Sequence, residues 1–378
     1  MNNKLKHLKS IIAKNRIDAV LISSVPNIIY LDGYSGFSYF EREAFLLISK
    51  KIVTQPQGLA HKTPGVFGYL ITDGRYSEAV SKIPYFGILE ISNKNSLDDI
   101  FKSLSKNIKK IGIEEYNISL SESKKLKKYF KLIPSKDLRN LRIIKEKNEV
   151  LKIKKACQIG DEAFDFIVKK IKSGITEKEL AFKLEYFIKK KHADISFPPI
   201  VAFGKNSSIP HHQTSSEKLR TNSIVLLDFG VKFENYCSDM TRTVFFGKAD
   251  EKFKKIYNTT LESQQKAIKF LNSSFIIHNS KTKPVKTASI DKAARQYIIR
   301  SGYPTIPHSL GHGIGIDVHE SPRLSPKSKD ILKEGMVFSI EPGIYIPNYG
   351  GVRIEDIVVL ENKGICLLTH SPKHLIEI

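Results

Sequence analysis

Residues 227–243 read LDFGVKFENYCSDMTRT and place two aspartates, Asp228 and Asp239, among runs of apolar and β-branched residues. Such runs are typical of strands that are buried in a sheet. Aspartate is rare there, because removing an unpaired carboxylate from water is costly. The stretch therefore constrains the fold in two ways. It predicts a pair of strands, and it requires a group that compensates two buried negative charges.

The spacing of the two aspartates predicts how the strands pair. A hairpin whose loop centres on Phe233 and Glu234 places Asp228 directly opposite Asp239. Opposed side chains on one face of a sheet have Cβ atoms about 5 Å apart, and like charges in such positions destabilise the pair. We therefore expect a cation between the two carboxylates or a proton on one of them. A proton shared as in aspartic proteases would require two Asp-centred turns, which the sequence lacks.

A second pair of carboxylates lies near the C-terminus, in FSIEPGIYIPNYGGVRIEDIVV at 338–359. A turn centred on Asn348 places Glu341 level with Glu355 in the same way. Four carboxylates on two neighbouring strand pairs are an excess of negative charge that favours divalent cations such as Mn²⁺, Co²⁺, Zn²⁺ or Fe²⁺. Because carboxylates can bridge, the pattern favours two ions a few ångströms apart.

Histidines gather in PHSLGHGIGIDVHE, residues 307–320, which holds His308, His312 and His319. Glycines on both sides of His312 disfavour a helix, so its step of four from His308 is not the helical ligand pair of zinc peptidases. A further pair follows Pro210 in the stretch PHH at 210–212. This clustering indicates a functional site rather than isolated structural histidines.

The chain divides into two regions near residue 138. Short helical and strand signals alternate in residues 1–138, as in LKHLKSIIAKNRI followed by DAVLIS, and indicate a small α/β core. Residues 139–378 combine longer helices with the strand runs of one antiparallel sheet, so the fold class is α+β. The first long helix is expected to end at Gly174, and a capping box of Thr176 and Glu179 opens the next. The helical stretches are expected at 138–174, 176–191, 251–271 and 290–300.

Composition limits the classes of protein that the chain can belong to. With 41% hydrophobic and 26% charged residues among 378, it is expected to be a soluble globular protein with a sizeable core. Its start lacks the features of a signal peptide, and no apolar run reaches the roughly 20 residues that span a bilayer. We therefore expect a cytoplasmic protein that does not enter membranes.

The net charge of +22 raises the question of a nucleic-acid partner. The excess divides evenly between the first 146 residues and the rest, whereas a phosphate-binding face concentrates it. The most basic stretch, SESKKLKKYFK at 121–131, is expected to be the solvated face of a short helix. Nucleic acid is therefore not expected as a partner. Cys157, Cys237 and Cys366 show no spacing of a zinc site or disulfide framework and are expected to be buried free thiols.

DFG, CSDMTRT, GHGIGIDVHE, EPGIYI and GGVRIED, in this order and spacing, resemble the pita-bread metallopeptidases, the family of aminopeptidase P, prolidase, methionine aminopeptidase and creatinase. The resemblance covers the chain from about Leu141. NIIYLDGYSG at 27–36 and ITDGRY at 71–76 resemble the family's creatinase-type N-terminal domain. The resemblance implies a small α/β creatinase-like domain at 1–138 and a pita-bread domain with a curved antiparallel sheet at 139–378.

The resemblance also assigns metal ligands. It implies two divalent metal ions, Mn²⁺ first and Co²⁺, Zn²⁺ or Fe²⁺ as alternatives, held by Asp228, Asp239, His312, Glu341 and Glu355. Asp228 would bind one ion, and Asp239 and Glu355 would bridge to the second. His312 and Glu341 would complete the shell of that second ion.

Catalytic and substrate-binding roles follow from the same resemblance. Glu341 would handle a proton, while His308 and His319 would orient the peptide and stabilise the tetrahedral oxyanion. His211 and Arg353 match positions that contact the substrate.

Thr241 and His212 lie near these positions in the sequence and are expected to have supporting and peripheral places, respectively. The hydroxyl of Thr241 would hold a bridging carboxylate, and His212 is expected to be peripheral. Residues 272–288 depart from the family pattern and are expected to form an inserted loop.

The implied activity is hydrolysis of Xaa-Pro bonds by a metallo-exopeptidase, either an Xaa-Pro aminopeptidase or an Xaa-Pro dipeptidase. Hydroxide formed at the metals would attack the scissile carbonyl of a proline-containing peptide. A homodimer is expected. One alternative is a peptidase like methionine aminopeptidase, although such enzymes normally lack a domain like residues 1–138. The other is a non-catalytic pita-bread binding protein, although such relatives usually lose metal ligands.

Overall fold

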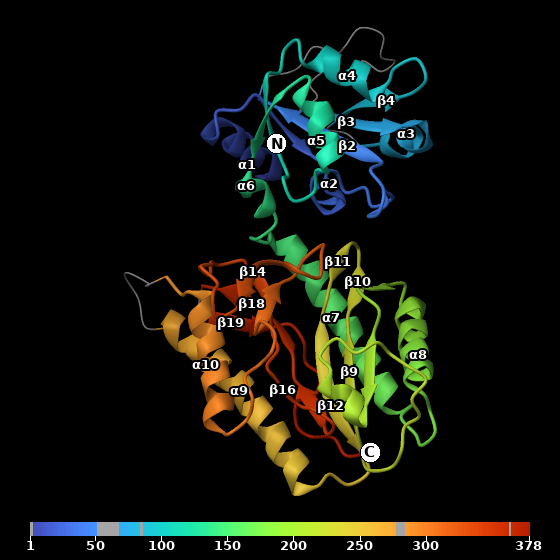
Figure 1. Ribbon diagram of the computed structural model, residues 1–378, viewed down its shortest axis with the longest axis vertical. Coiled ribbons are helices and arrows are strands. Elements are labelled where there is room, and N and C mark those ends of the chain that lie inside the picture. The colour runs from blue at the N-terminus through green and yellow to red at the C-terminus, as the bar shows by residue number, and fades with distance from the viewer. Residues whose placement is uncertain (1–2, 51–67, 84–85, 277–283, 363) are drawn as a thin grey trace. The chain divides into compact units, whose positions relative to one another are not determined.

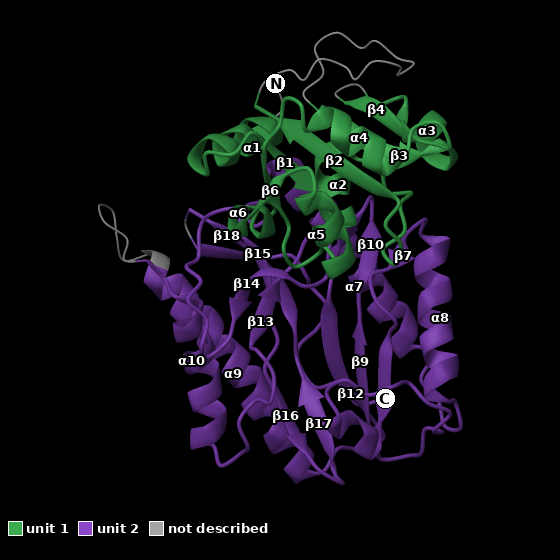
Figure 2. Ribbon diagram, turned by 45° about the horizontal axis from the view of Figure 1, so that its top comes forward, with its two compact units in different colours: residues 1–142 green, residues 143–378 purple. Residues whose placement is uncertain are grey.

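The chain forms two compact units, residues 1–142 and residues 143–378, which Figure 2 colours separately. The structure is a computed structural model, and it describes residues 3–50, 68–83, 86–276, 284–362 and 364–378. No helix within these residues combines the length and the apolar character needed to cross a membrane.

Unit 1 is built on a six-stranded mixed sheet with the order β4-β3-β2-β1-β5-β6. Its strands are β1 (Ala19–Ile22), β2 (Ala44–Ser49), β3 (Gly68–Asp73), β4 (Gly87–Ile91), β5 (Lys110–Ile113) and β6 (Lys131–Pro134). Its helices are α1 (Asn3–Lys14), α2 (Val25–Asp32), α3 (Gly74–Val80), α4 (Leu97–Leu104), α5 (Leu120–Lys127) and α6 (Lys136–Arg139). All residues of β1 and β2 are buried, as in a sheet that helices cover.

Unit 2 combines long helices with antiparallel strands (Figure 1). The helices are α7 (Lys147–Val168), α8 (Glu177–Lys190), α9 (Glu251–Ile276), α10 (Thr287–Arg300) and the 3₁₀ turn η1 (Gly204–Ser208). The strands of its first half are β7 (Asp194–Ile195), β8 (Ile200–Phe203), β9 (Ser223–Phe229), β10 (Val231–Phe233), β11 (Tyr236–Cys237) and β12 (Met240–Phe246). Those of its second half are β13 (Gly311–Gly313), β14 (Glu320–Leu324), β15 (Val337–Ile340), β16 (Gly343–Ile346), β17 (Gly350–Arg353), β18 (Asp356–Glu361) and β19 (Gly364–Leu367).

The strands of unit 2 are hydrogen-bonded in four groups rather than in one continuous sheet. Their orders are β11-β10-β7, β12-β9-β8, β14-β13-β15-β18-β19 and β16-β17. The helix pairs α7/α8 and α9/α10 lie on opposite flanks of these strands in Figures 1 and 2. Each pair has its own apolar core. Phe164 and Leu184 pack with β8, β9 and β12, whereas Phe253 and Ile298 pack with strands from β15 to β18.

The helix ends agree with one prediction from the sequence and differ from two others, the end of the first long helix and the length of the loop at 272–288. Thr176 and Glu179 form the predicted capping box at the start of α8. The preceding helix α7 ends at Val168 rather than at Gly174, which lies in the following turn with a φ of 81°. The loop expected at 272–288 is shorter, because α9 continues to Ile276 and α10 begins at Thr287, while residues 277–283 lie outside the described part of the chain.

The cysteines are free thiols, as expected. Cys157 and Cys237 are buried, whereas Cys366 is exposed because it lies in the edge strand β19.

The hairpin that carries the two aspartates differs from its predicted register. Strands β9 and β12 pair Asp228 with Thr241 and not with Asp239. The cause is the turn, in which Glu234 and Asn235 have positive φ values of 44° and 71° and form a two-residue loop. The loop centre therefore lies one residue later than expected, which shifts every pair by two residues.

Asp239 lies in an interruption of this hairpin, between β11 and β12. Gly230 lies in the matching interruption between β9 and β10. A Cβ atom on Gly230 would approach the carbonyl oxygen of Ser238 to 2.1 Å and the hydroxyl of Ser196 to 2.0 Å, so only glycine fits. Asp239 itself makes no strand pair in this interruption, so its side chain can face other strands.

The second carboxylate pair has its predicted register. Ile340 at the end of β15 pairs with Asp356 at the start of β18, and Gly343 at the start of β16 pairs with Arg353 at the end of β17. Asn348, with a φ of 63°, lies in the intervening turn. Glu341 and Glu355 therefore lie level with each other, between the two paired stretches.

Candidate metal centre

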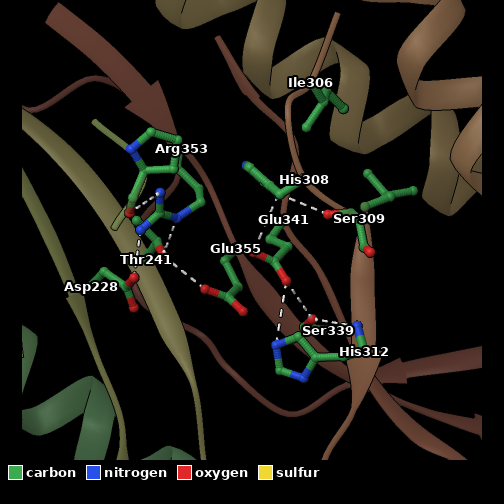
Figure 3. Close-up of polar contacts among 12 residues, drawn as sticks. Asp228, Thr241, Ile306, His308, Ser309, His312, Ser339, Glu341, Arg353 and Glu355 are labelled. Carbon is green, nitrogen blue, oxygen red and sulfur yellow. Dashed lines mark hydrogen bonds and ion pairs between the residues drawn. The ribbon is translucent and has the colours of Figure 1, made fainter. Parts of the chain in front are cut away.

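Five acidic and imidazole side chains converge in unit 2 from separate strands and strand ends, and Figure 3 labels Asp228, His312, Glu341 and Glu355 among them. Asp228 lies on β9, and Asp239 follows β11 in the same hairpin. His312 lies on the short strand β13, between two glycines. Glu341 directly follows β15, and Glu355 directly precedes β18. All five residues predicted as metal ligands thus lie in one region.

Among the five predicted ligands, His312 lies close to two of the carboxylates. Its Nε2 atom lies 3.3 Å from Oε1 of Glu341 and 3.6 Å from Oδ2 of Asp239. One ligand atom from each of Asp239, His312 and Glu355 lies within 4.8 Å of the others. These separations are those of groups that could share an ion.

The protonation of His312 follows from its surroundings. Its Nδ1 atom lies 3.1 Å from the carbonyl oxygen of Gly313, which can only accept a hydrogen bond, so Nδ1 carries the proton. Burial lowers the pKa of His312 to about 4, and the ring is therefore neutral at pH 7. The lone pair of Nε2 consequently faces carboxylate oxygens, an arrangement that is repulsive unless a cation or a proton lies between them.

The carboxylates show the same excess of negative charge. Burial raises the pKa of Asp239 and of Glu341 well above their usual values, and the charge of Glu355 adds to both shifts. Burial, reinforced by Asp228, raises the pKa of Glu355 to about 8. Without a cation, the folded protein therefore favours protonation of these groups.

Two oxygens in the region have no hydrogen-bond partner among the described residues. They are Oδ1 of Asp239 and Oε1 of Glu355, and both are buried. Buried acceptors without a partner are rare, because they have lost water and gained nothing in exchange. With the lone pair of His312, they form a set of oxygen and nitrogen donors that suits divalent transition-metal ions. The residues therefore fit a divalent cation.

Asp228 has a different partner, the buried guanidinium of Arg353. Nη2 of Arg353 forms an ion pair with Oδ2 of Asp228, while Nε donates to the hydroxyl of Thr241 at 3.0 Å. Thr241 in turn donates to Glu355 at 2.7 Å, which is the hydrogen bond expected for it. Part of the positive charge that the sequence required thus comes from an arginine of the second strand pair.

His308 lies beside the carboxylates with both nitrogens engaged. Its Nδ1 atom lies 2.8 Å from the carbonyl oxygen of Ser309 and 3.9 Å from Oε2 of Glu341. Its Nε2 atom lies 2.9 Å from the hydroxyl of Tyr345, which accepts from Arg353 at 2.8 Å. Because Arg353 only donates, the hydroxyl hydrogen of Tyr345 points to His308. Burial lowers the pKa of His308 to about 4.

The other predicted histidines occupy distinct positions. The edge of the His319 ring meets the ring of His312, with centroids 4.4 Å apart. His211 is exposed, yet close enough that a charge on it lowers the pKa of His308 and of His319. His212 instead binds the buried carboxylate of Glu177, with Nε2 at 2.8 Å from Oε2.

Two residues at the site were not predicted from the sequence. Ser339 accepts from the backbone N–H of His312 at 3.1 Å and donates to Glu341 at 3.1 Å. Its position two residues before Glu341 in a strand was the available signal, because such residues share a face. Tyr345, which connects Arg353 to His308, had no comparable signal.

Known proteins share both units of this chain. Residues 151–362 match the model of metallopeptidase family M24, and residues 4–144 match that of the creatinase/prolidase N-terminal domain. The chain belongs to metallopeptidase family M24. Members of this family use divalent metal ions, so the chain is a metal-dependent peptidase, in agreement with the donor set described above.

Full-length relatives extend this result. The Xaa-Pro dipeptidase of Pyrococcus horikoshii is 36% identical over 385 residues, which cover 100% of this chain and 99% of that protein. Among solved structures, an Xaa-Pro dipeptidase from Bacillus anthracis has a TM-score of 0.86 and 34% identity, covering 100% of this chain and 99% of that chain. An X-Pro aminopeptidase from Thermotoga maritima has a TM-score of 0.81 and 33% identity, covering 96% and 98%. The expected family and its two-domain creatinase-like fold are thus confirmed.

Proposed function

We propose that this M24 protein is an exopeptidase that hydrolyses Xaa-Pro bonds, as a dipeptidase or an aminopeptidase, at a centre of two divalent metal ions. One observation carries the proposal. Asp239 and Glu355 each have a buried carboxylate oxygen without a hydrogen-bond partner among the described residues. These carboxylates lie close to Nε2 of His312, which presents a lone pair to them. The preference for proline is supported by the names of the full-length relatives, which include both a dipeptidase and an aminopeptidase.

The proposed ligands are Asp228, Asp239, His312, Glu341 and Glu355. Carboxylate-rich sites with one imidazole suit Mn²⁺, with Co²⁺, Zn²⁺ or Fe²⁺ as alternatives. Asp239 and Glu355, each with a buried oxygen that has no partner among the described residues, would hold the ions, together with the other three side chains. Bound divalent ions would activate water at neutral pH and polarise the scissile carbonyl.

The side chains around the centre have proposed roles in the reaction. Glu341, whose Oε1 atom lies 3.3 Å from Nε2 of His312, would take up and release a proton during the reaction. His308 and His319 border the site and would orient the peptide and stabilise the developing oxyanion. His211, which is exposed, would contact the substrate directly, and Arg353 is proposed to contact it from the buried side of the site. We also propose that the enzyme acts as a cytoplasmic homodimer.

Hydrolysis assays with Mn²⁺-loaded protein test the proposal. We expect proline release from an Xaa-Pro dipeptide, or release of Xaa from an Xaa-Pro-Yaa tripeptide, and the ratio of the two kcat/KM values distinguishes a dipeptidase from an aminopeptidase. Asp239→Asn should abolish turnover, whereas Asp165→Asn, the same change at an exposed position on α7, should not. Absence of turnover on both substrates with metal bound would refute the assignment.

A further inference from the structure

The backbone is interrupted where the two glutamates enter the site. The pairing of β15 with β18 ends at Ile340 and Asp356, and the next pair, Gly343 and Arg353, lies three residues away on each side. In the gap, the N–H of Glu341 donates to the carbonyl of Leu310 at 2.8 Å, and the N–H of Glu355 donates to the carbonyl of Thr241 at 3.1 Å. The peptide groups beside the glutamates therefore need partners from outside the ladder.

One side chain of α9 supplies partners for two of these groups. The amide nitrogen of Gln264 lies 3.1 Å from the carbonyl oxygen of Ile340 and 3.3 Å from that of Ile354. Each of these carbonyls belongs to the residue directly before a proposed metal ligand, Glu341 or Glu355. Gln264 has no exposed surface, so water does not compete for these hydrogen bonds.

The orientation of Gln264 follows from its two partners. Both are carbonyl oxygens, which only accept, so the side chain must present its NH₂ group to them. The opposite atom, Oε1, is then buried without a hydrogen-bond partner among the described residues. An apolar residue on α9 would avoid this unsatisfied oxygen, but it would leave the carbonyls of Ile340 and Ile354 without a donor. The side chain of Gln264 is therefore oriented by the two strands that carry the glutamates.

We propose that Gln264 is a positioning residue of the metal centre, which sets the separation of Glu341 and Glu355 by holding the carbonyls that precede them. This inference rests on the proposed function in one respect, the assignment of both glutamates as metal ligands. Its physical basis is that a bidentate amide fixes two strands at one distance, and that groups behind the ligands tune metal affinity without touching the metal.

Metal-binding measurements on Gln264→Met test the proposal. Methionine matches the length of glutamine, but it cannot donate a hydrogen bond. The matched control is Ser263→Ala, because Ser263 is equally buried on the same helix and donates to the carbonyl of Ala294, away from the ligands. We expect calorimetry to show a roughly 10- to 100-fold weaker Kd for Mn²⁺ in Gln264→Met and a wild-type Kd in Ser263→Ala. Both variants should lower the Tm of the metal-free protein.

Gln264→Asn provides a second variant if the methionine protein does not fold, because it keeps a polar amide but is one methylene too short to reach both carbonyls. A wild-type Kd for Mn²⁺ in any folded variant at this position, with only a lower Tm, would overturn the proposal. Failure of the wild-type protein to bind Mn²⁺ would overturn the metal centre and this inference together. A wild-type protein that binds Mn²⁺, and in which Gln264→Met weakens binding, supports the inference even if no Xaa-Pro substrate is cleaved.

Discussion

Replacing Glu355 by glutamine should stabilise the protein when metal is absent. In the structure, Oε2 of Glu355 accepts from Thr241 at 2.7 Å, while Oε1 is buried without a partner among the described residues. Glutamine keeps an acceptor for Thr241 and replaces the unpaired oxygen with an NH₂ group. It also removes one negative charge from the neighbourhood of Asp239, whose own pKa the charge of Glu355 raises.

The magnitude follows from the pKa of Glu355, which rises from 4.5 to about 8 on folding. A raised carboxyl pKa means that ionisation destabilises the folded state. This effect is absent below about pH 4.5, grows between pH 4.5 and 8, and is complete above pH 8. Each pKa unit corresponds to about 1.4 kcal/mol, so at pH 7 the raised pKa of Glu355 lowers the stability of the metal-free folded state by about 3 kcal/mol.

Thermal unfolding in EDTA measures this effect. For a unit of this size about 1 kcal/mol shifts Tm by roughly 2–4 °C, so Glu355→Gln should melt roughly 6–12 °C above the wild type at pH 7. The difference should narrow as the pH is lowered from 8 towards 5. Added Mn²⁺ should raise the Tm of the wild type much more than that of the variant. A ligand stabilises a folded protein in proportion to how tightly it binds, and the variant lacks one of the proposed metal ligands.

The outcome that contradicts this reasoning is a metal-free Glu355→Gln protein that melts at or below the wild-type temperature. Glu361→Gln serves as the control, because it makes the same chemical change at an exposed position at the end of β18. Its Tm should match that of the wild type with and without Mn²⁺.

Three further substitutions probe the surroundings of the site. His212→Ala should lower the free energy of unfolding by about 1–3 kcal/mol, as measured in urea, because it leaves the buried carboxylate of Glu177 without one partner. His211→Ala should instead raise the KM for an Xaa-Pro dipeptide and leave unfolding unchanged, because His211 is exposed. Arg242→Met should lower the free energy of unfolding by about 3–5 kcal/mol, because it breaks the buried ion pair with Asp356.

A specific result would refute each of these expectations. Equal loss of stability in His211→Ala and His212→Ala would refute the distinction between the two neighbours. For Arg242→Met the control is Arg220→Met at an exposed position, and equal unfolding curves for the two variants would show that the buried pair contributes nothing.

Much of the site could be predicted, because the residue types that bind metal occur at characteristic short spacings in the sequence. Aspartates in apolar strands, together with histidines clustered between glycines, indicate a metal centre whatever the surrounding fold, since a nearby cation offsets the cost of burying carboxylates. The turn around Asn348 could also be predicted, and the strands that pair across it, β16 with β17 and β15 with β18, have the predicted register. The other hairpin was misjudged, because Glu234 and Asn235 adopt the left-handed conformation and move the loop by one residue.

The sequence by itself determined which groups carry charge and that their strands pair, because residue type and short-range spacing decide both. Only the tertiary structure decided which groups meet. Arg353 neutralises Asp228 from 125 positions away, and Gln264 reaches the carbonyls of Ile340 and Ile354 from a helix on the flank of the strands. Such contacts depend on how helices and strands pack across the core, and no local pattern records that packing. The sequence thus supplied the charges of the metal centre, and the fold supplied the partners that hold them in place.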